Sequence, residues 1–151
     1  SPAGIEKGAH LAMFYADEAL VVTNPEISSV RDSDRVLGLL ASKTHRAETG
    51  QPPLKEQLIL TRYSADRVTR GEMLSVEDVQ DILAIDLLGV IPESQAVLNA
   101  SNSGVPVIME DDSEAGQAYL DLVNRYLGED VPHRFVDPKK PGFFGRLFGA
   151  S

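Results

Sequence analysis

The sequence contains no cysteine among its 151 residues. Without thiols the chain can form neither a disulfide framework nor a thiolate metal site, and this composition suits a reducing cytosol. It also has no run of about 18 apolar residues, the length that a helix needs to span a bilayer. The histidines are His10, His45 and His133, and they share no metal-ligand spacing. We therefore predict no metal site within the chain.

Two motifs of catalysis are also missing. No stretch fits G-x-x-x-x-G-K-[ST], the P-loop whose backbone N–H groups hold the phosphates of a nucleotide. No G-x-S-x-G elbow of a serine hydrolase occurs either. We therefore expect no catalytic residue in this chain.

The charge balance is acidic, with 23 Asp and Glu against 14 Lys and Arg and a formal net charge of −9. Such a balance argues against a general affinity for nucleic acid or for an anionic membrane, although it leaves room for a local basic patch. We predict no nucleic-acid partner. With 42% hydrophobic residues, the chain can bury one core.

Short apolar runs alternate with amphipathic stretches along the chain. The runs 20–23, 58–61 and 87–91 are continuous and branched, which predicts strands covered on both faces. Residues 105–108 are a weaker strand candidate, because Pro106 cannot donate to a central ladder. The alternation with helices predicts an α/β fold with right-handed crossovers and a mostly parallel sheet.

Amphipathic spacing predicts three helices between and after these strands. The first covers residues 29–43, the second follows Ser75 as its N-cap, and the third follows Ser113 and stops at Gly128. The side chains expected to face the core in the second and third helices are Val76, Val79, Ile82, Leu83, Ala115, Ala118, Tyr119, Leu122, Val123 and Tyr126.

Ligands of parallel α/β sheets bind beyond the carboxyl ends of the strands. Arg62, Pro92 and Glu93 follow two of the predicted strands, where they could grip the edge and face of an adenine. Arg62 could equally stack on Tyr63 or pair with a surface carboxylate, and the sequence leaves these alternatives open.

Two further segments near strand ends are candidates for contacts. The opening residues Pro2, Ala3 and Gly4 are expected to form a turn, in which the backbone amides of Ala3 and Gly4 could point at a phosphate; the alternative is an ordinary loop. Glu6 is either a favourable charge at a helix N-terminus or a contact across a dimer. The acidic helix start at residues 28–35 is explained by dipole compensation and solvation, or by a protein-binding face.

A composition break divides the chain into a globular part, residues 1–137, and a linker and tail, residues 138–151. Three of the five phenylalanines lie in the tail, which is also locally basic. As a helix it would gather its apolar side chains on one face, as in segments that lie in a lipid interface. The alternative is that these aromatics dock onto the domain and close its core. The residues concerned are Lys139, Lys140, Phe143, Phe144, Arg146, Leu147 and Phe148.

A family resemblance runs in order along the whole chain. It rests on residues 1–9, 23–26, 28–35, 60–63, 67–68, 70–71 and 89–93 and on the tail. These residues resemble the MinD family of bacterial septum-site-determining ATPases, in the deviant Walker A group with the ParA proteins. The resemblance implies a three-layer α/β/α fold of the P-loop NTPase type, with the N-terminal portion absent from this chain.

The resemblance also implies a function. Family members form an ATP-dependent homodimer with Mg²⁺, lie in the cytoplasm and bind the anionic inner membrane peripherally through the tail. They recruit a MinC-like inhibitor of division and respond to a MinE-like activator of ATP hydrolysis. The family's P-loop, catalytic lysines, switch I and metal ligands have no counterpart here, so we expect the isolated chain not to hydrolyse ATP.

The resemblance assigns roles to residues of this chain. Pro2, Ala3 and Gly4 correspond to switch II, and Arg62, Pro92 and Glu93 to the adenine site. The dimer or partner face comprises Glu6, Glu26, Ser28, Asp32 and Asp34. Residues 63–65 read Tyr-Ser-Ala where the family more usually has Tyr-Asn-Pro, a small departure.

Two other functions remain open at this point. One is a non-enzymatic α/β interaction module that tethers partners to a membrane. The other is a different ParA-type ATPase, for instance one that positions flagella or plasmids. A half-sheet with an unpaired apolar edge would also make the isolated chain poorly soluble or self-associating.

Overall fold

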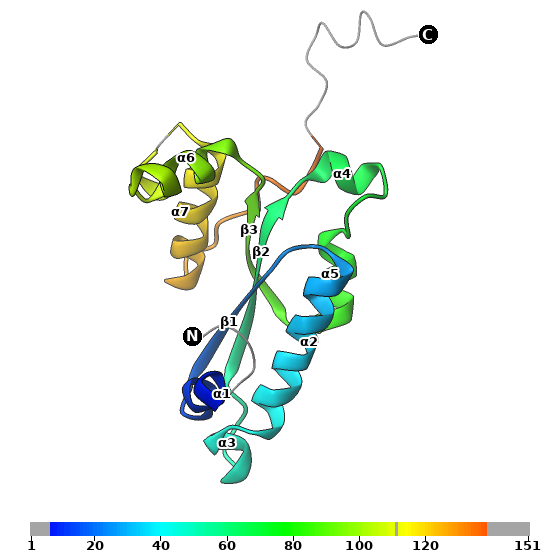
Figure 1. Cartoon of the computed structure of the whole chain (residues 1–151), viewed down its shortest axis with the longest axis vertical. Helices are drawn as coiled ribbons and strands as arrows, with labels where there is room; N and C mark the ends of the chain where they lie inside the picture. Colours follow the sequence, from blue (N-terminus) through cyan, green and yellow to red (C-terminus); the bar gives the residue numbers. More distant parts are fainter. Residues whose placement is uncertain (1–6, 111, 139–151) are drawn as a thin grey trace, which may run out of the picture.

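The computed structural model describes residues 7–110 and 112–138, which fold around a three-stranded parallel sheet (Figure 1). Its strands are β1 (Glu18–Thr23), β2 (Lys55–Tyr63) and β3 (Asp86–Pro92), in the order β1-β2-β3. Both strand pairs are parallel, so the three carboxyl ends share one edge of the sheet. The predicted parallel α/β fold is confirmed.

Helices lie on both sides of this sheet (Figure 1). The crossover from β1 to β2 contains α2 and the short α3, and the crossover from β2 to β3 contains α4 and α5. In Figure 1, α2 and α5 lie to the right of the strands, and α6 and α7 lie to the left. The bounds are α1 (Lys7–Phe14), α2 (Ile27–Ser42), α3 (His45–Glu48), α4 (Ala65–Thr69), α5 (Val76–Leu83), α6 (Gln95–Ser103), η1 (Val107–Met109) and α7 (Glu114–Tyr126).

The core consists of two clusters of buried residues, one on each face of the sheet. The larger packs α2 and α5 against β1, β2 and β3, with Val30, Leu58, Leu60 and Val79 fully buried. The smaller packs α7 against Ile59, Leu88 and Ile91. Burying each such side chain stabilises the fold by about 1.5–3 kcal/mol before entropy is counted. The two clusters together produce the layered arrangement.

Two helix starts were predicted correctly from their serines. The Ser75 hydroxyl accepts from the Asp78 backbone N–H at 3.0 Å while the Asp78 carboxylate accepts from the Ser75 N–H at 3.0 Å, which is a capping box. The Ser113 hydroxyl accepts from the Gly116 N–H at 2.9 Å. The helix expected at 29–43 begins slightly earlier, at Ile27, with Glu26 as a cap that makes no side-chain hydrogen bond.

The strand candidate at 105–108 was wrong. Val107–Met109 form a 3-10 helix whose N-cap is Pro106. Proline has no N–H for a strand ladder, and its fixed φ, here −62°, suits a helix entry instead. The segment therefore turns the chain from α6 into α7.

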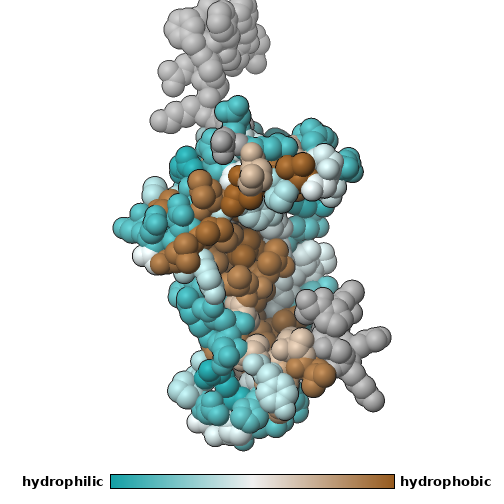
Figure 2. Space-filling model, turned by 90° about the vertical axis from the view of Figure 1, so that its left-hand side faces the viewer, coloured by the Kyte–Doolittle hydropathy of each residue, from teal (hydrophilic) through white to brown (hydrophobic). Residues whose placement is uncertain are grey.

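The expectation that every strand is covered on both faces was wrong for β1. Val21 and Thr23 are buried beneath α2, whereas Leu20 and Val22 are 45% and 59% exposed. The reason is that α7 packs on β3, and from there its Tyr126 hydroxyl donates to the Glu18 carboxylate of β1 at 2.7 Å. Figure 2 shows a broad apolar area across the middle of this side of the molecule.

Three helix residues expected in the core are also exposed. Ile82 is 48% exposed, Val123 39% and Tyr126 45%. The helical spacing identified the apolar stripe correctly but overestimated its buried width.

We predict that the isolated chain self-associates through the exposed face of β1. Exposed apolar strand surface favours pairing with another copy. Replacing Leu20 and Val22 by threonine, which keeps a β-branched side chain at position 22, should shift sedimentation-velocity profiles towards monomer. The matched control is Ile82→Thr, which removes a similarly exposed apolar group on α5 and should leave association unchanged. A monodisperse wild-type monomer would contradict this prediction.

Candidate functional site

The loops that follow β2 and β3 meet at the carboxyl edge of the sheet. The Glu93 backbone N–H donates to the Tyr63 carbonyl at 2.9 Å, so the first residue after β3 is held beside the end of β2. The guanidinium of Arg62 lies 3.8 Å from the Glu93 carboxylate. The structure thus brings Arg62, Pro92 and Glu93 together, as expected of one binding site.

Arg62 has an unusual backbone conformation within this site. Its φ is +56°, in the left-handed region, and the pairing register of β2 and β3 shifts between Leu60 and Tyr63. A non-glycine residue is rarely held in this region, and such positions are concentrated at ligand sites. Of the alternatives for the Arg62 side chain, the structure supports the pair with a carboxylate. That ion pair is solvent-exposed and worth at most about 1 kcal/mol.

A cavity of about 500 Å³ opens beside these loops. This size lies within the usual range for small-molecule sites. Its walls come from four parts of the chain: the end of β2 with the start of α4, the loop after β3, the start of α7, and residues 131–138, which we call the C-terminal strap. The lining residues are Tyr63, Ser64, Ala65, Asp66, Pro92, Glu93, Glu114, Arg134, Phe135, Asp137 and Pro138.

The charge of the lining favours one part of a nucleotide over another. Four carboxylates and one guanidinium line the cavity. Carboxylates accept hydrogen bonds from amino and hydroxyl groups, whereas they repel phosphates. The cavity therefore suits the base and ribose of a nucleotide. Among the described residues, no group of three or more His, Asp or Glu is placed to hold a metal ion.

The C-terminal strap is attached to the domain by arginines. The Arg125 guanidinium donates to the carbonyls of Val131 and Pro132 at 2.6 and 2.9 Å, and to that of Leu88 on β3 at 2.9 Å. The Tyr63 hydroxyl donates to the Val136 carbonyl at 3.3 Å. Helix α7, strand β3 and the end of β2 therefore all hold the strap.

A bidentate ion pair fixes the middle of the strap. Arg134 donates to both carboxylate oxygens of Asp121 on α7, at 2.8 and 2.9 Å, and to the Gln117 side-chain carbonyl at 3.3 Å. The Asp121 side chain is only 9% exposed. No sequence pattern identified these residues, because an arginine in an irregular segment does not reveal a partner on a distant helix.

Two side chains at the strap have shifted pKa values. Burial, followed by the charges of Glu77 and Asp137, raises the pKa of Tyr63, which keeps its hydroxyl protonated as a donor to the strap. Burial and then the Arg125 guanidinium lower the pKa of His133, whose Nδ1 has no hydrogen-bond partner among the described residues. Both groups therefore remain neutral at pH 7.

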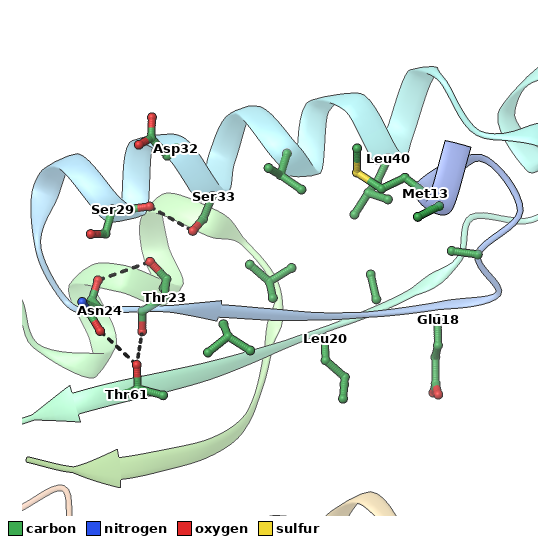
Figure 3. Close-up of a pocket in the computed structure, with 16 residues that line it drawn as sticks. Met13, Glu18, Leu20, Thr23, Asn24, Ser29, Asp32, Ser33, Leu40 and Thr61 are labelled. Carbon is green, nitrogen blue, oxygen red and sulfur yellow. Dashed lines mark hydrogen bonds between the residues drawn. The ribbon is translucent and has the colours of Figure 1, made fainter. Parts of the chain in front are cut away.

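A second cavity, of about 590 Å³, lies between α1, β1 and α2 (Figure 3). At one end, the Thr61 hydroxyl bonds to the Asn24 side-chain oxygen at 2.9 Å, which ties the ends of β1 and β2 together. Asp32 borders the cavity, but its carboxylate points away from β1 (Figure 3). The remaining lining is largely apolar, so this cavity offers few directed contacts to a polar ligand.

The candidate partner face on α2 is exposed but not flat. Glu26, Ser28, Asp32 and Asp34 are all exposed. Ser28 and Asp32 are four residues apart and share one side, whereas Asp32 and Asp34 lie about 160° apart around the helix axis. A single flat surface can therefore contact Ser28 and Asp32 together, but not Asp32 and Asp34.

The other candidate residues lie outside the described part of the chain. They are Pro2, Ala3, Gly4 and Glu6 near the start, and Lys139, Lys140, Phe143, Phe144, Arg146, Leu147 and Phe148 in the tail. Among the described residues, no helix has both the length and the apolar character to cross a membrane.

The parallel sheet, the helices on both of its faces and the cavity at its carboxyl edge define a fold of the MinD/ParA class of P-loop NTPases. No protein-family model matches the chain. It is 62% identical over 149 residues to the septum site-determining protein MinD of Escherichia coli K12, covering 99% of this chain and 55% of that protein. The chain belongs to the MinD family and corresponds to the C-terminal portion of its members.

Solved structures agree with this assignment. MinD in the MinC:MinD complex of Aquifex aeolicus superposes with a TM-score of 0.77 at 41% identity, covering 90% of this chain and 52% of that one. MinD of Pyrococcus horikoshii, complexed with Mg-ADP, gives 0.66 at 29% identity, covering 86% and 51%. This chain thus spans about half the length of the relatives that it matches.

Proposed function

We propose that this chain is part of a membrane-associated ATPase that positions the division septum. In this proposal the protein dimerises with ATP, binds the inner membrane from the cytoplasm, recruits a MinC-like division inhibitor and is released after a MinE-like activator stimulates hydrolysis. The observation that carries the proposal is the base-sized cavity between two strand-end loops, in a chain that matches MinD over 99% of its length.

The chain's own contribution to nucleotide binding is the base end of the site. Pro92 and Glu93 line the cavity, and the Arg62 guanidinium lies 3.8 Å from the Glu93 carboxylate. ATP supplies the phosphoanhydride bond, and Mg²⁺ accompanies it, as Mg-ADP accompanies the Pyrococcus relative. Switch II, at Pro2, Ala3 and Gly4, would report the γ-phosphate through the backbone amides of Ala3 and Gly4.

The proposed surface for the division inhibitor is the Ser28–Asp32 side of α2. A MinC:MinD complex exists for the Aquifex relative, which supports a partner of this kind. Asp32 is highly exposed and pairs with its neighbour Arg35 at 3.4 Å, so it remains accessible to a basic group on a partner. Glu6, Glu26 and Asp34 are assigned to the dimer or to other parts of the partner surface.

The proposed membrane contact is the tail. Four apolar side chains can contribute at most about 6–12 kcal/mol if fully buried. Ordering some eight residues, at ~1–2 kcal/mol each, offsets most of this. One tail therefore binds weakly, and two tails in a dimer gain roughly 10²-fold through effective concentration. ATP-dependent dimerisation would thus control attachment to the membrane.

The test uses a chimera in which this chain follows the part of E. coli MinD that precedes the matched region. We expect the chimera to hydrolyse ATP, and to sediment with vesicles containing anionic phospholipid in ATP but much less in ADP. Equal sedimentation in both nucleotides, without hydrolysis, would contradict the proposal and favour the non-enzymatic tether.

A single substitution tests the base site. Arg62→Ala should weaken binding of fluorescent ADP to the chimera about 3–10-fold, the size expected for one charged contact. The matched control is Arg70→Ala, because Arg70 pairs at 2.8 Å with Glu72, which does not line the cavity, whereas Arg62 pairs with the cavity residue Glu93. If the two variants bind fluorescent ADP with equal affinity, Arg62 does not contribute to the base site.

A further inference from the structure

We infer that the C-terminal strap positions the tail: it fixes the point at which the chain leaves the domain, so that the two tails of a dimer reach one membrane together. The inference rests on the membrane contact proposed above and adds to it the residues that hold the origin of the tail. These residues lie on α7, at the end of β2 and in the strap itself.

The strap crosses the carboxyl edge of the sheet. Phe135 packs against the smaller core cluster, on the α7 side, and its neighbour Val136 packs against the larger cluster, on the side of α2 and α5. Two consecutive side chains thus hold the chain from opposite faces of the sheet. Pro138 lines a cavity of about 190 Å³ together with Val68 of α4 and Val76 of α5. The strap therefore carries the chain from α7 to the α4 corner of the domain (Figure 1).

Hydrogen bonds hold the strap at three points along its length. At its root, the Arg125 guanidinium donates to two backbone carbonyls of the strap. In its middle, Asp121 accepts two bonds from Arg134, and at its end the Tyr63 hydroxyl donates to the Val136 carbonyl. Residues 131–138 form no helix or strand of their own, so these bonds and the two apolar contacts fix the path of the strap.

The length of chain between domain and tail decides how well two tails cooperate. With the strap held at its end, residues 139–142 separate the domain from Phe143, the first aromatic residue of the predicted tail. With the strap released back to Gly128, the separating stretch becomes residues 129–142, roughly 3.5 times as long. Effective concentration falls roughly as the −3/2 power of linker length, so binding by the second tail should weaken about 3–10-fold.

The effect should be confined to the dimer. The tail of a monomer binds a vesicle without help from a second tail, so the length of its linker does not matter. The strap should therefore change sedimentation in ATP and leave the weak sedimentation in ADP as it is. A residue that only stabilises the fold would shift the urea midpoint without changing the ratio of ATP-state to ADP-state binding.

The first test lengthens the linker and leaves every strap contact in place. Five Gly-Ser repeats, about ten residues, are inserted between Pro138 and Lys139 of the chimera defined above. Sedimentation with vesicles of phosphatidylcholine and phosphatidylglycerol is measured in saturating ATP and in ADP. The insertion should weaken binding in ATP about 3–10-fold and leave binding in ADP unchanged. The matched control carries the same insert after Ser151, where it does not lengthen the linker, and should change neither value.

The second test releases the strap itself. Val136→Ser removes the apolar contact at its end, and Asp121→Asn removes the charge that pairs with Arg134. Neither side chain lines the larger cavity at the strand ends. Together they should weaken ATP-state binding by a factor similar to that of the insertion, and adding the insertion should weaken it little further. The matched control is Val36→Ser, which removes a partly buried side chain from the same cluster on α2 and should leave the ratio unchanged.

The outcomes separate the inference from the function on which it rests. An unchanged ATP-to-ADP binding ratio in either the insertion variant or the strap double variant would overturn the inference, even if the unsubstituted chimera still sediments with ATP. An equal loss in Val36→Ser would reveal a general loss of stability and would also overturn it. Equal sedimentation of the unsubstituted chimera in both nucleotides would overturn the proposed function, and this inference with it.

Discussion

Replacing Phe143 and Phe148 by glutamate is expected to abolish sedimentation of the chimera with anionic vesicles in ATP. Each substitution removes an aromatic ring worth roughly 1.5–3 kcal/mol when buried and adds a charge of the same sign as the lipid headgroups. Because a dimer carries two tails, the loss counts twice in the bound state. We expect a drop in the bound fraction of more than about tenfold.

The control for this experiment adds the same charge without removing a ring. The double variant Gly149→Glu with Ser151→Glu should bind the vesicles only modestly less than the unsubstituted chimera. Its binding should be restored when the vesicles contain little anionic lipid. ATP hydrolysis by the double phenylalanine variant should remain, since the tail is not assigned to the nucleotide site. Undiminished sedimentation of that variant would show that the tail does not carry the membrane contact, and a lowered urea midpoint would favour docking of its aromatics onto the domain.

Gly116→Ala is expected to destabilise the fold, whereas Gly38→Ala should stabilise it slightly. A Cβ on Gly116 would lie 2.6 Å from the Glu110 carbonyl oxygen and 2.7 Å from that of Val107, so the backbone between η1 and α7 must move. Overpacking of this kind costs about 1–3 kcal/mol. A Cβ on Gly38 in α2 meets no atom within 4 Å, and alanine there gains roughly 0.5–1 kcal/mol of helix propensity.

The same chemical change at two helical glycines thus has opposite expected signs. The measurement is the urea midpoint of the chimera followed by circular dichroism, with the slope checked for constancy. Equal shifts for the two variants would mean that the close approach of η1 to α7 does not constrain the fold. Gly116→Ala should also weaken nucleotide binding, because α7 carries both Glu114 and the anchor of the strap.

Local sequence patterns predicted the elements that depend on local chemistry. Ser75 and Ser113 identified two helix starts because a hydroxyl at an N-cap meets backbone donors only two or three residues away. The buried strands were recognisable because a strand between two helical layers must be apolar, as at 58–60. The parallel order then follows from the alternation of strand and helix.

Patterns failed where burial depends on a neighbour distant in sequence. Leu20 and Val22 have the composition of a covered strand, yet α7 packs over β3 and leaves them exposed. Pro106 lies in an apolar run that reads as a strand, although it begins a 3-10 helix. The width and position of the covering helix decide which apolar side chains are buried. Neither can be read from a short stretch of sequence.

The candidate site shows the same division. The sequence by itself determined the family, the parallel α/β class and the two loops that hold Arg62, Pro92 and Glu93, because strand ends and their polar residues are contiguous in the chain. Only the tertiary structure brought Arg134 to Asp121 and closed the pocket with the strap. That contact depends on how an irregular segment returns over α7, and such long-range pairing is set by packing of the whole domain.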